Sequence, residues 1–255
     1  MHQKKAKYKQ VENYTNHFKN QQQSIKQKKL KFKTLIIYVY LPVVILLNII
    51  FFTSLLTNTP VDIFSRDPAA ILAEQKIVSF LGFKTNPFIG VISNLGLLLW
   101  CASASVYLFA FLLKTANNKQ KQKQKQSDSS LFLLLMGLFS LVLLFDDMLL
   151  FHEVIAPKLF IPEKAIYICY MAITIYLMLK FRKILFTTET IPLYLAFLFF
   201  FLSIIIDIFN FSSIFLEDGF KLLGIASWAS YSVIVALQLS QDYIVRPWDA
   251  YTNTK

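Results

Sequence analysis

The sequence contains little charge, cysteine, glycine or histidine, and each shortage excludes a class of protein. Only 16% of its 255 residues are charged while 56% are hydrophobic, which is too apolar for a single water-soluble domain. The two cysteines, Cys101 and Cys169, both lie in apolar stretches, so we expect neither a disulfide scaffold nor a cysteine metal site. The chain also lacks the motifs GxxxxGK[ST], GxGxxG, HExxH, GxSxG and CxxC. The sequence therefore does not resemble the common nucleotide-binding proteins, zinc peptidases or serine hydrolases that carry these motifs.

The apolar residues are concentrated in six blocks, each near the length that crosses a bilayer. A helix needs about 20 mainly apolar residues to cross a hydrocarbon core, since no water there satisfies an exposed backbone. The fourth block is the shortest and requires Lys164 and Lys180 to reach outward from its ends. The sequence therefore predicts an all-α polytopic membrane bundle over residues 34–240, with spans at about 34–56, 87–113, 131–151, 162–180, 191–209 and 220–240.

The basic residues predict the orientation of this bundle. Twenty of the 26 Lys and Arg residues fall in the tail 1–33, the loops 114–130 and 180–190, and the tail 241–255. Because membrane insertion keeps such residues in the cytoplasm, we expect both termini there, most simply in a bacterial inner membrane. The tail 1–33 is predicted to be disordered, and its lysine run beside the first span is placed to meet anionic lipid headgroups. The lysine-rich stretch 119–126 has no interleaved aromatic residues, so no nucleic-acid partner is predicted.

Carboxylates inside the spans are the most informative polar residues. Asp146 lies about 22 Å along its helix from Leu131, and Asp207 about 24 Å along its helix from Ile191, so two helices carry acids at a similar depth. A charge at the bilayer centre costs about 2.5–3.5 kcal/mol on insertion scales, so each acid requires a reason. The sequence predicts an outward-facing polar pocket rich in carboxylates.

We expect this pocket to bind a divalent cation, and a lipid-borne substrate is the candidate for the molecule on which the protein would act. Oxygen ligands suit hard cations, and a histidine can add a nitrogen ligand. On an unbroken helix Asp146 and Glu153 would be about 10 Å apart and could not share an ion, so other helices must contribute. The candidate metal ligands are Asp146, Asp147 and Glu217, then His152, Asp207 and Asp218; the other candidate pocket residues are Glu153, Asn48, Asn94, Lys221, Trp228 and Tyr231.

Two other interpretations remain open, and the sequence does not decide whether the protein is an enzyme. The acids are also typical of a proton- or cation-coupled transporter, although the inner halves of the spans offer few polar residues for a complete path. Alternatively the protein is a scaffold whose acids have structural roles, paired with lysines such as Lys221, with Glu217 and Asp218 favoured by a helix N-terminus and His152 marking the water boundary. A favourable pair between Glu217 and Lys221, and close helix packing at Gly224, are expected on the last helix.

The segments DDMLLFHE, ending at Glu153, and EDGFKLLG, beginning at Glu217, together resemble a pattern in uncharacterised bacterial multi-pass membrane proteins. The resemblance covers the C-terminal half and implies a shared acidic site. By contrast, ceramidase-like membrane hydrolases bind zinc through several intramembrane histidines. This sequence has only His152 near the membrane, which disfavours a three-histidine zinc hydrolase.

Overall fold

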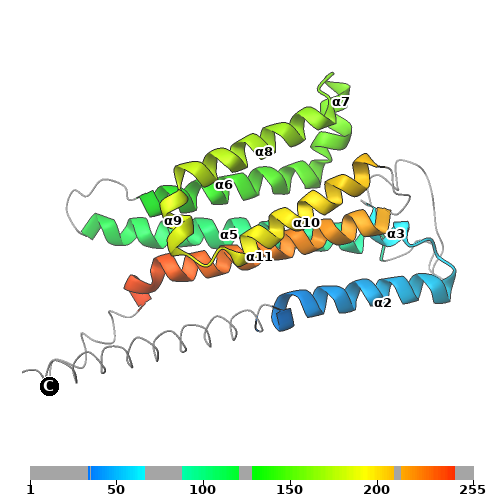
Figure 1. Ribbon diagram of the computed structural model, residues 1–255, viewed down its shortest axis with the longest axis horizontal. Helices are drawn as coiled ribbons and strands as arrows, with labels where there is room; N and C mark the ends of the chain where they lie inside the picture. Colours follow the sequence, from blue (N-terminus) through cyan, green and yellow to red (C-terminus); the bar gives the residue numbers. More distant parts are fainter. Residues whose placement is uncertain (1–33, 35, 67–87, 121–127, 210–213, 245–255) are drawn as a thin grey trace, which may run out of the picture. The chain divides into compact units, whose positions relative to one another are not determined.

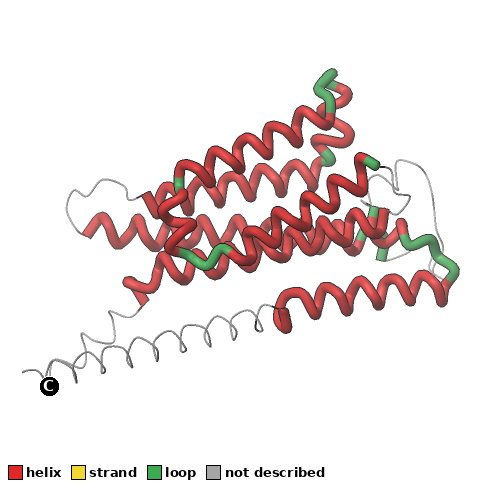
Figure 2. Tube along the Cα trace, viewed as in Figure 1, coloured by secondary structure: helices red, strands yellow, loops and turns green. Residues whose placement is uncertain are grey.

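The computed structural model describes residues 34, 36–66, 88–120, 128–209 and 214–244. The predicted basic tail 1–33 and most of the predicted tail 241–255 lie outside them. Helices make up nearly all of the described part, and no strand is found there (Figure 2). The elements are η1 (Ile36–Tyr40), α2 (Leu41–Thr57), α3 (Asp62–Ser65), α5 (Val91–Gln120), α6 (Asp128–Leu149), η2 (Phe151–Ile155), α7 (Ala156–Lys158), α8 (Glu163–Lys180), α9 (Arg182–Thr187), α10 (Ile191–Ile208) and α11 (Ile214–Ile244).

Five helical stretches within the described residues are long and apolar enough to cross a membrane. They are Ile37–Thr57, Val91–Ala116, Asp128–Leu149, Ile191–Ile208 and Ile214–Ser240. Each falls on one of the six predicted blocks. The prediction of an all-α membrane protein is therefore confirmed.

The shortest predicted span also forms a helix, α8, but it is not one of these five. Glu163, Lys164 and Lys180 lie at its two ends and lower its apolar character. Its middle nevertheless exposes large apolar side chains, among them Ile168 and Met171, as a lipid-facing helix would. The presence of six spans stays a prediction.

Two helices extend beyond their predicted ends. Helix α5 continues to Gln120, into the predicted loop 114–130, because lysine and glutamine are good helix formers. Helix α11 begins at Ile214 and continues to Ile244, so it starts before the predicted residue 220 and enters the predicted tail. Glu217 lies in its first turn, where the helix dipole favours an acidic side chain.

The chain divides into two compact units, Met1–Leu46 and Leu47–Lys255. Apart from residue 34, the described residues of the first unit belong to η1 and the beginning of α2. In the second unit α11 packs along both α10 and α5, and α5 packs along α6 (Figure 1). Helix α8 lies beside α6, where Phe139 and Tyr170 make an edge-to-face contact.

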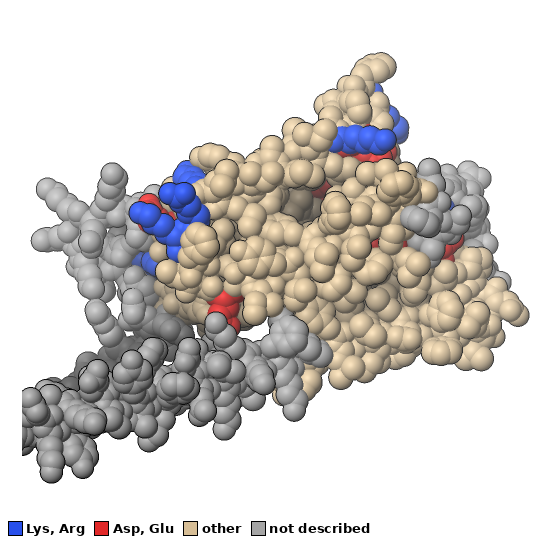
Figure 3. Space-filling view, in the orientation of Figure 1, with Lys and Arg blue, Asp and Glu red and all other residues tan. Residues whose placement is uncertain are grey.

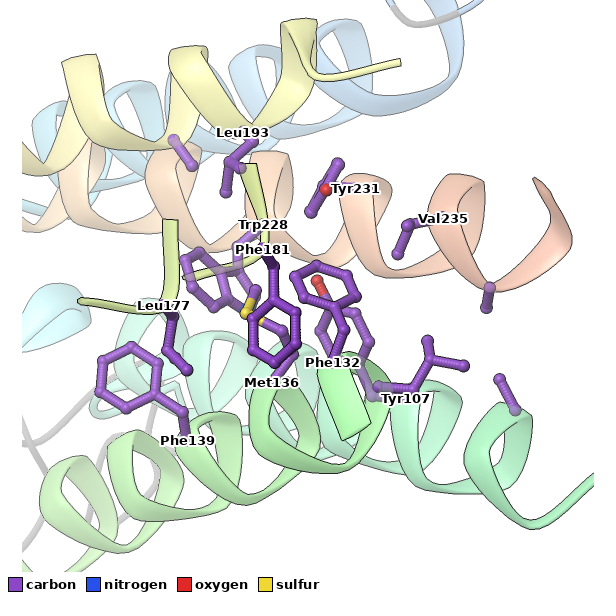
Figure 4. Packing of buried hydrophobic residues seen from close by; sticks show 14 of the residues in the cluster. Tyr107, Phe132, Met136, Phe139, Leu177, Phe181, Leu193, Trp228, Tyr231 and Val235 are labelled. Carbon is purple, nitrogen blue, oxygen red and sulfur yellow. The ribbon is translucent and has the colours of Figure 1, made fainter. Parts of the chain in front are cut away.

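The core of the second unit is rich in aromatic residues (Figure 4). Trp228 of α11 is buried against Phe139, Phe197 and Trp100, and its Nε1–H donates a hydrogen bond of 3.0 Å to Ser140 Oγ. The expected close approach at Gly224 is confirmed, since a Cβ atom there would lie 2.7 Å from the Phe200 ring. This packing holds α5, α6, α10 and α11 together beneath the polar groups described next.

Candidate functional site

The candidate site begins where α6 ends. The helix stops at Leu149, and Leu150 adopts the left-handed conformation with φ 49° and ψ 42°. Few residues other than glycine and asparagine adopt this conformation without strain. The chain then continues as η2, which brings His152 back beside Asp146.

His152 is buried and bonded to two acids. Its Nδ1 lies 2.6 Å from Asp146 Oδ2, and its Nε2 lies 3.4 Å from Glu153 Oε1. The helix is therefore broken between Asp146 and Glu153, and the 10 Å separation derived for an unbroken helix does not apply. With 3% of its surface exposed, His152 is buried within the protein.

The hydrogen bonds of His152 change the pKa values of both His152 and Glu153. Burial lowers the pKa of His152, but the hydrogen bonds to Asp146 and Glu153 outweigh it and raise the pKa to about 9. The hydrogen bond from His152 lowers the pKa of Glu153, against the effect of burial. At neutral pH the imidazole thus holds a proton between two carboxylates, and a metal ion bound to His152 would have to displace that proton.

Asp147 connects three helices through its two oxygens. Trp100 of α5 donates its Nε1–H to Oδ2 at 2.9 Å, and Lys221 of α11 donates from Nζ to Oδ1 at 2.9 Å. Lys221 therefore forms its ion pair across helices, whereas the sequence led us to expect a pair with Glu217 on the same helix. The cross-helix pair matches the structural role considered for these acids.

Asp146, Asp147 and His152 form a compact group of potential metal ligands. One ligand atom from each lies within 4.8 Å of the others. Asp146 is 6% exposed, and its Oδ1 has no well-aligned hydrogen-bond partner in the described part of the chain. The Tyr170 hydroxyl of α8 lies close enough for a weak hydrogen bond to the same carboxylate. Glu217, Asp207 and Asp218 are not part of this group.

A cavity of about 230 Å³ lies beside the group, at the end of the bundle that carries α3 and η2. Six carboxylates and two basic groups line it, so its surface is acidic. The lining residues with ionisable or hydroxyl side chains are Ser65, Arg66, Ser93, Asp147, Glu153, Glu163, Tyr167, Asp207, Glu217, Asp218 and Lys221. On the face shown in Figure 3, charged side chains gather toward the ends of the molecule and the surface between them is largely uncharged.

The predicted pocket residues divide into three sets. Six of them line the cavity, namely Asp147, Glu153, Asp207, Glu217, Asp218 and Lys221. Asp146 and His152 are bonded to each other next to it. The remaining four, Asn48, Asn94, Trp228 and Tyr231, are not among its lining residues; Trp228 and Tyr231 belong to the aromatic core because α11 carries their stripe into the bundle.

Several site residues were missed from the sequence. Trp100 looks like any aromatic residue in an apolar span, and Arg66 lies in a connection with no motif. Glu163 and Tyr167, whose hydroxyl donates to Glu163 Oε1 at 2.8 Å, lie one turn apart on α8. An i,i+4 polar pair at the start of the fourth span was the one local signal that pointed to them.

Comparison with known proteins places the chain in a family. No curated protein and no solved structure matches it. The family described as "Domain of unknown function (DUF8692)" matches residues 37–235, which include every candidate site residue of α6, η2 and α11. This match agrees with the resemblance to uncharacterised membrane proteins and covers more than half of the sequence, so the chain belongs to the DUF8692 family.

Proposed function

We propose that this integral membrane protein binds a divalent cation through Asp146, Asp147 and His152, beside the acidic cavity. The observation that carries the proposal is the Oδ1 atom of Asp146, which is buried and has no well-aligned hydrogen-bond partner among the described residues. Leaving a buried polar atom without a partner costs about 1–3 kcal/mol, and more for a charged group. A cation at this oxygen would remove that cost.

The spacing and chemistry of the three groups suit one ion. Metal–oxygen distances of about 2.0–2.6 Å allow ligand atoms on opposite sides of an ion to lie up to about 5 Å apart. The ligand atoms here lie within 4.8 Å of one another, well inside the separation of about 8 Å that would have excluded a shared ion. Two carboxylates with one imidazole are compatible with hard ions such as Mn²⁺.

The cavity supports an extension of the proposal to a lipid-borne substrate. A bound divalent ion would polarise a phosphate or carbonyl oxygen placed next to it. The cavity of about 230 Å³ is lined by Asp147, one of the three ligands, and is large enough for a small polar headgroup. We place the protein in a bacterial inner membrane with both termini in the cytoplasm, on the strength of its lysine distribution.

The apolar core next to the site favours cation binding over cation transport. A transported proton or cation needs polar groups along its whole path. Toward the other end of the bundle, the described residues next to this site are the aromatic core of Phe139, Trp228 and their neighbours. The cavity within that core is only about 10 Å³ and is lined mainly by apolar side chains.

The test is the metal content of purified protein after supplementation, beside Asp146→Asn. We expect about one equivalent of divalent metal in the wild type and a large loss in this variant. Asp128→Asn is the matched control, because Asp128 is an exposed acid at the other end of the same helix. Equal and negligible metal in all three proteins would overturn the proposal and favour a structural role for the acids.

A further inference from the structure

Lys221 occupies an oxygen that the proposed cation would need. Its Nζ lies 2.9 Å from Asp147 Oδ1, while Trp100 holds Oδ2 of the same carboxylate at 2.9 Å. Both oxygens of one proposed ligand are thus already engaged. The Lys221 side chain is 34% exposed and lines the cavity, so it is not locked in the core.

We propose that Lys221 is a built-in counter-ion that fills the site without a divalent cation and moves away from Asp147 when one binds, so that monovalent cations do not occupy the site. This inference rests on the proposed function, because it names the residue that decides which cations occupy the same site. Lys221 acts through Asp147, so it is a specificity-determining residue and not itself a ligand.

The charge of the ammonium group explains why monovalent cations do not occupy the site. A monovalent ion that displaces Lys221 exchanges one positive charge for another, so the attraction to the carboxylates hardly changes. A divalent ion brings one additional charge to the same acids and gains attraction. A divalent ion therefore gains enough electrostatic attraction to displace Lys221, and a monovalent ion does not.

The displaced ammonium group has other acids to approach. Asp218 and Glu153 also attract Lys221, and both line the cavity with it. A lysine can reach such neighbours because its ammonium sits on a flexible four-carbon chain. The adjoining volume of about 230 Å³ provides space for the movement.

Trp100 keeps Asp147 in place during the exchange. Its indole is 3% exposed and stacks on Phe200 with ring centroids 6.0 Å apart and an interplanar angle of 11°. The hydrogen bond to Oδ2 comes from this packed ring, whereas the bond to Oδ1 comes from a flexible chain. Only the Lys221 side of the carboxylate therefore has to change partner.

The test compares Mn²⁺ and Na⁺ binding to the full-length protein in detergent micelles, with Mn²⁺ followed by electron paramagnetic resonance and Na⁺ by competition. We expect Lys221→Met to bind Mn²⁺ about tenfold more tightly than the wild type or better, and to bind Na⁺ more tightly as well, because the same competing charge is removed for both ions. Lys221→Gln retains a hydrogen-bond donor without the charge, and carries the same test if Lys221→Met does not fold. Lys164→Met is the matched control. It removes one exposed lysine from α8, a helix whose Glu163 and Tyr167 line the cavity, and it should leave both affinities unchanged.

The outcomes separate this inference from the proposed function. If the wild type binds Mn²⁺ and both Lys221 variants bind it no more tightly, Lys221 is structural and the inference is overturned while the cation site stands. If the Lys221 variants bind Mn²⁺ and the wild type does so only weakly, both are supported. If none of the four proteins binds Mn²⁺, both are overturned.

Discussion

Replacing Gly224 by alanine should destabilise the bundle and disturb Asp147 through Phe200 and Trp100. A Cβ atom at this position would lie 2.7 Å from Cδ1 and Cε1 of Phe200, closer than real Cβ contacts allow. The Phe200 ring must then move, yet it is stacked on Trp100, whose indole holds Asp147. The methyl group therefore acts on the carboxylate through two aromatic rings.

The expected size of the effect follows from one stabilising and two destabilising terms. Alanine is a better helix former than glycine by about 1 kcal/mol. Overpacking a core typically costs about 1–3 kcal/mol, and weakening an aromatic pair adds about 0.5–1.5 kcal/mol. We therefore expect Gly224→Ala to lower the free energy of unfolding by about 1–3 kcal/mol.

Gly219 provides the matched control on the same helix. A Cβ atom there would lie 3.6 Å from Leu47, an ordinary contact, so Gly219→Ala should be neutral or stabilising by up to about 1 kcal/mol. Unfolding is measured in mixed micelles by the loss of helical circular dichroism with increasing SDS. Adding Phe200→Leu to Gly224→Ala should recover part of the loss, because the smaller side chain can move aside. Equal stability of the two alanine variants would refute the steric argument.

Further expectations concern the core, the turn at Leu150, the bound ion and the topology. Ser140→Ala leaves the buried Trp228 N–H without its acceptor and should cost about 1–2 kcal/mol in the same unfolding assay, with much of the loss recovered by adding Trp228→Phe. Leu150→Val should destabilise by about 1–2 kcal/mol while Leu150→Asn is tolerated, because β-branched residues fit the left-handed region poorly; equal effects would contradict this. A chelator should lower the unfolding midpoint of the wild type but not of Asp146→Asn, and an identical response would count against a bound ion. Reporter fusions at the two ends of the chain should both report the cytoplasm if there are six spans; opposite sides would show that α8 does not cross the membrane.

Much of the site could be predicted because the acids stand out against an apolar background. A carboxylate near the end of a membrane helix is costly wherever it points, so Asp146, Asp147 and Asp207 were identifiable without any knowledge of their partners. The depth of Asp207 on its helix predicted a shared pocket with the acids of α6, and Asp207 and Asp147 do line the same cavity. The turn at Leu150 was not predictable, because leucine is a helix former and no glycine or proline marks the position.

The amino-acid sequence by itself determined that the chain forms apolar helices long enough for a membrane and which of them carry acids, because helix length and burial cost depend on local composition. The partners of those acids were decided by the tertiary structure. Lys221 meets Asp147 and not Glu217, and Trp100 supplies the second hydrogen bond. Such contacts depend on how α5, α6 and α11 are rotated and packed against one another. That packing is set by the fit of side-chain volumes over the whole bundle, as at Gly224, where Phe200 approaches closely.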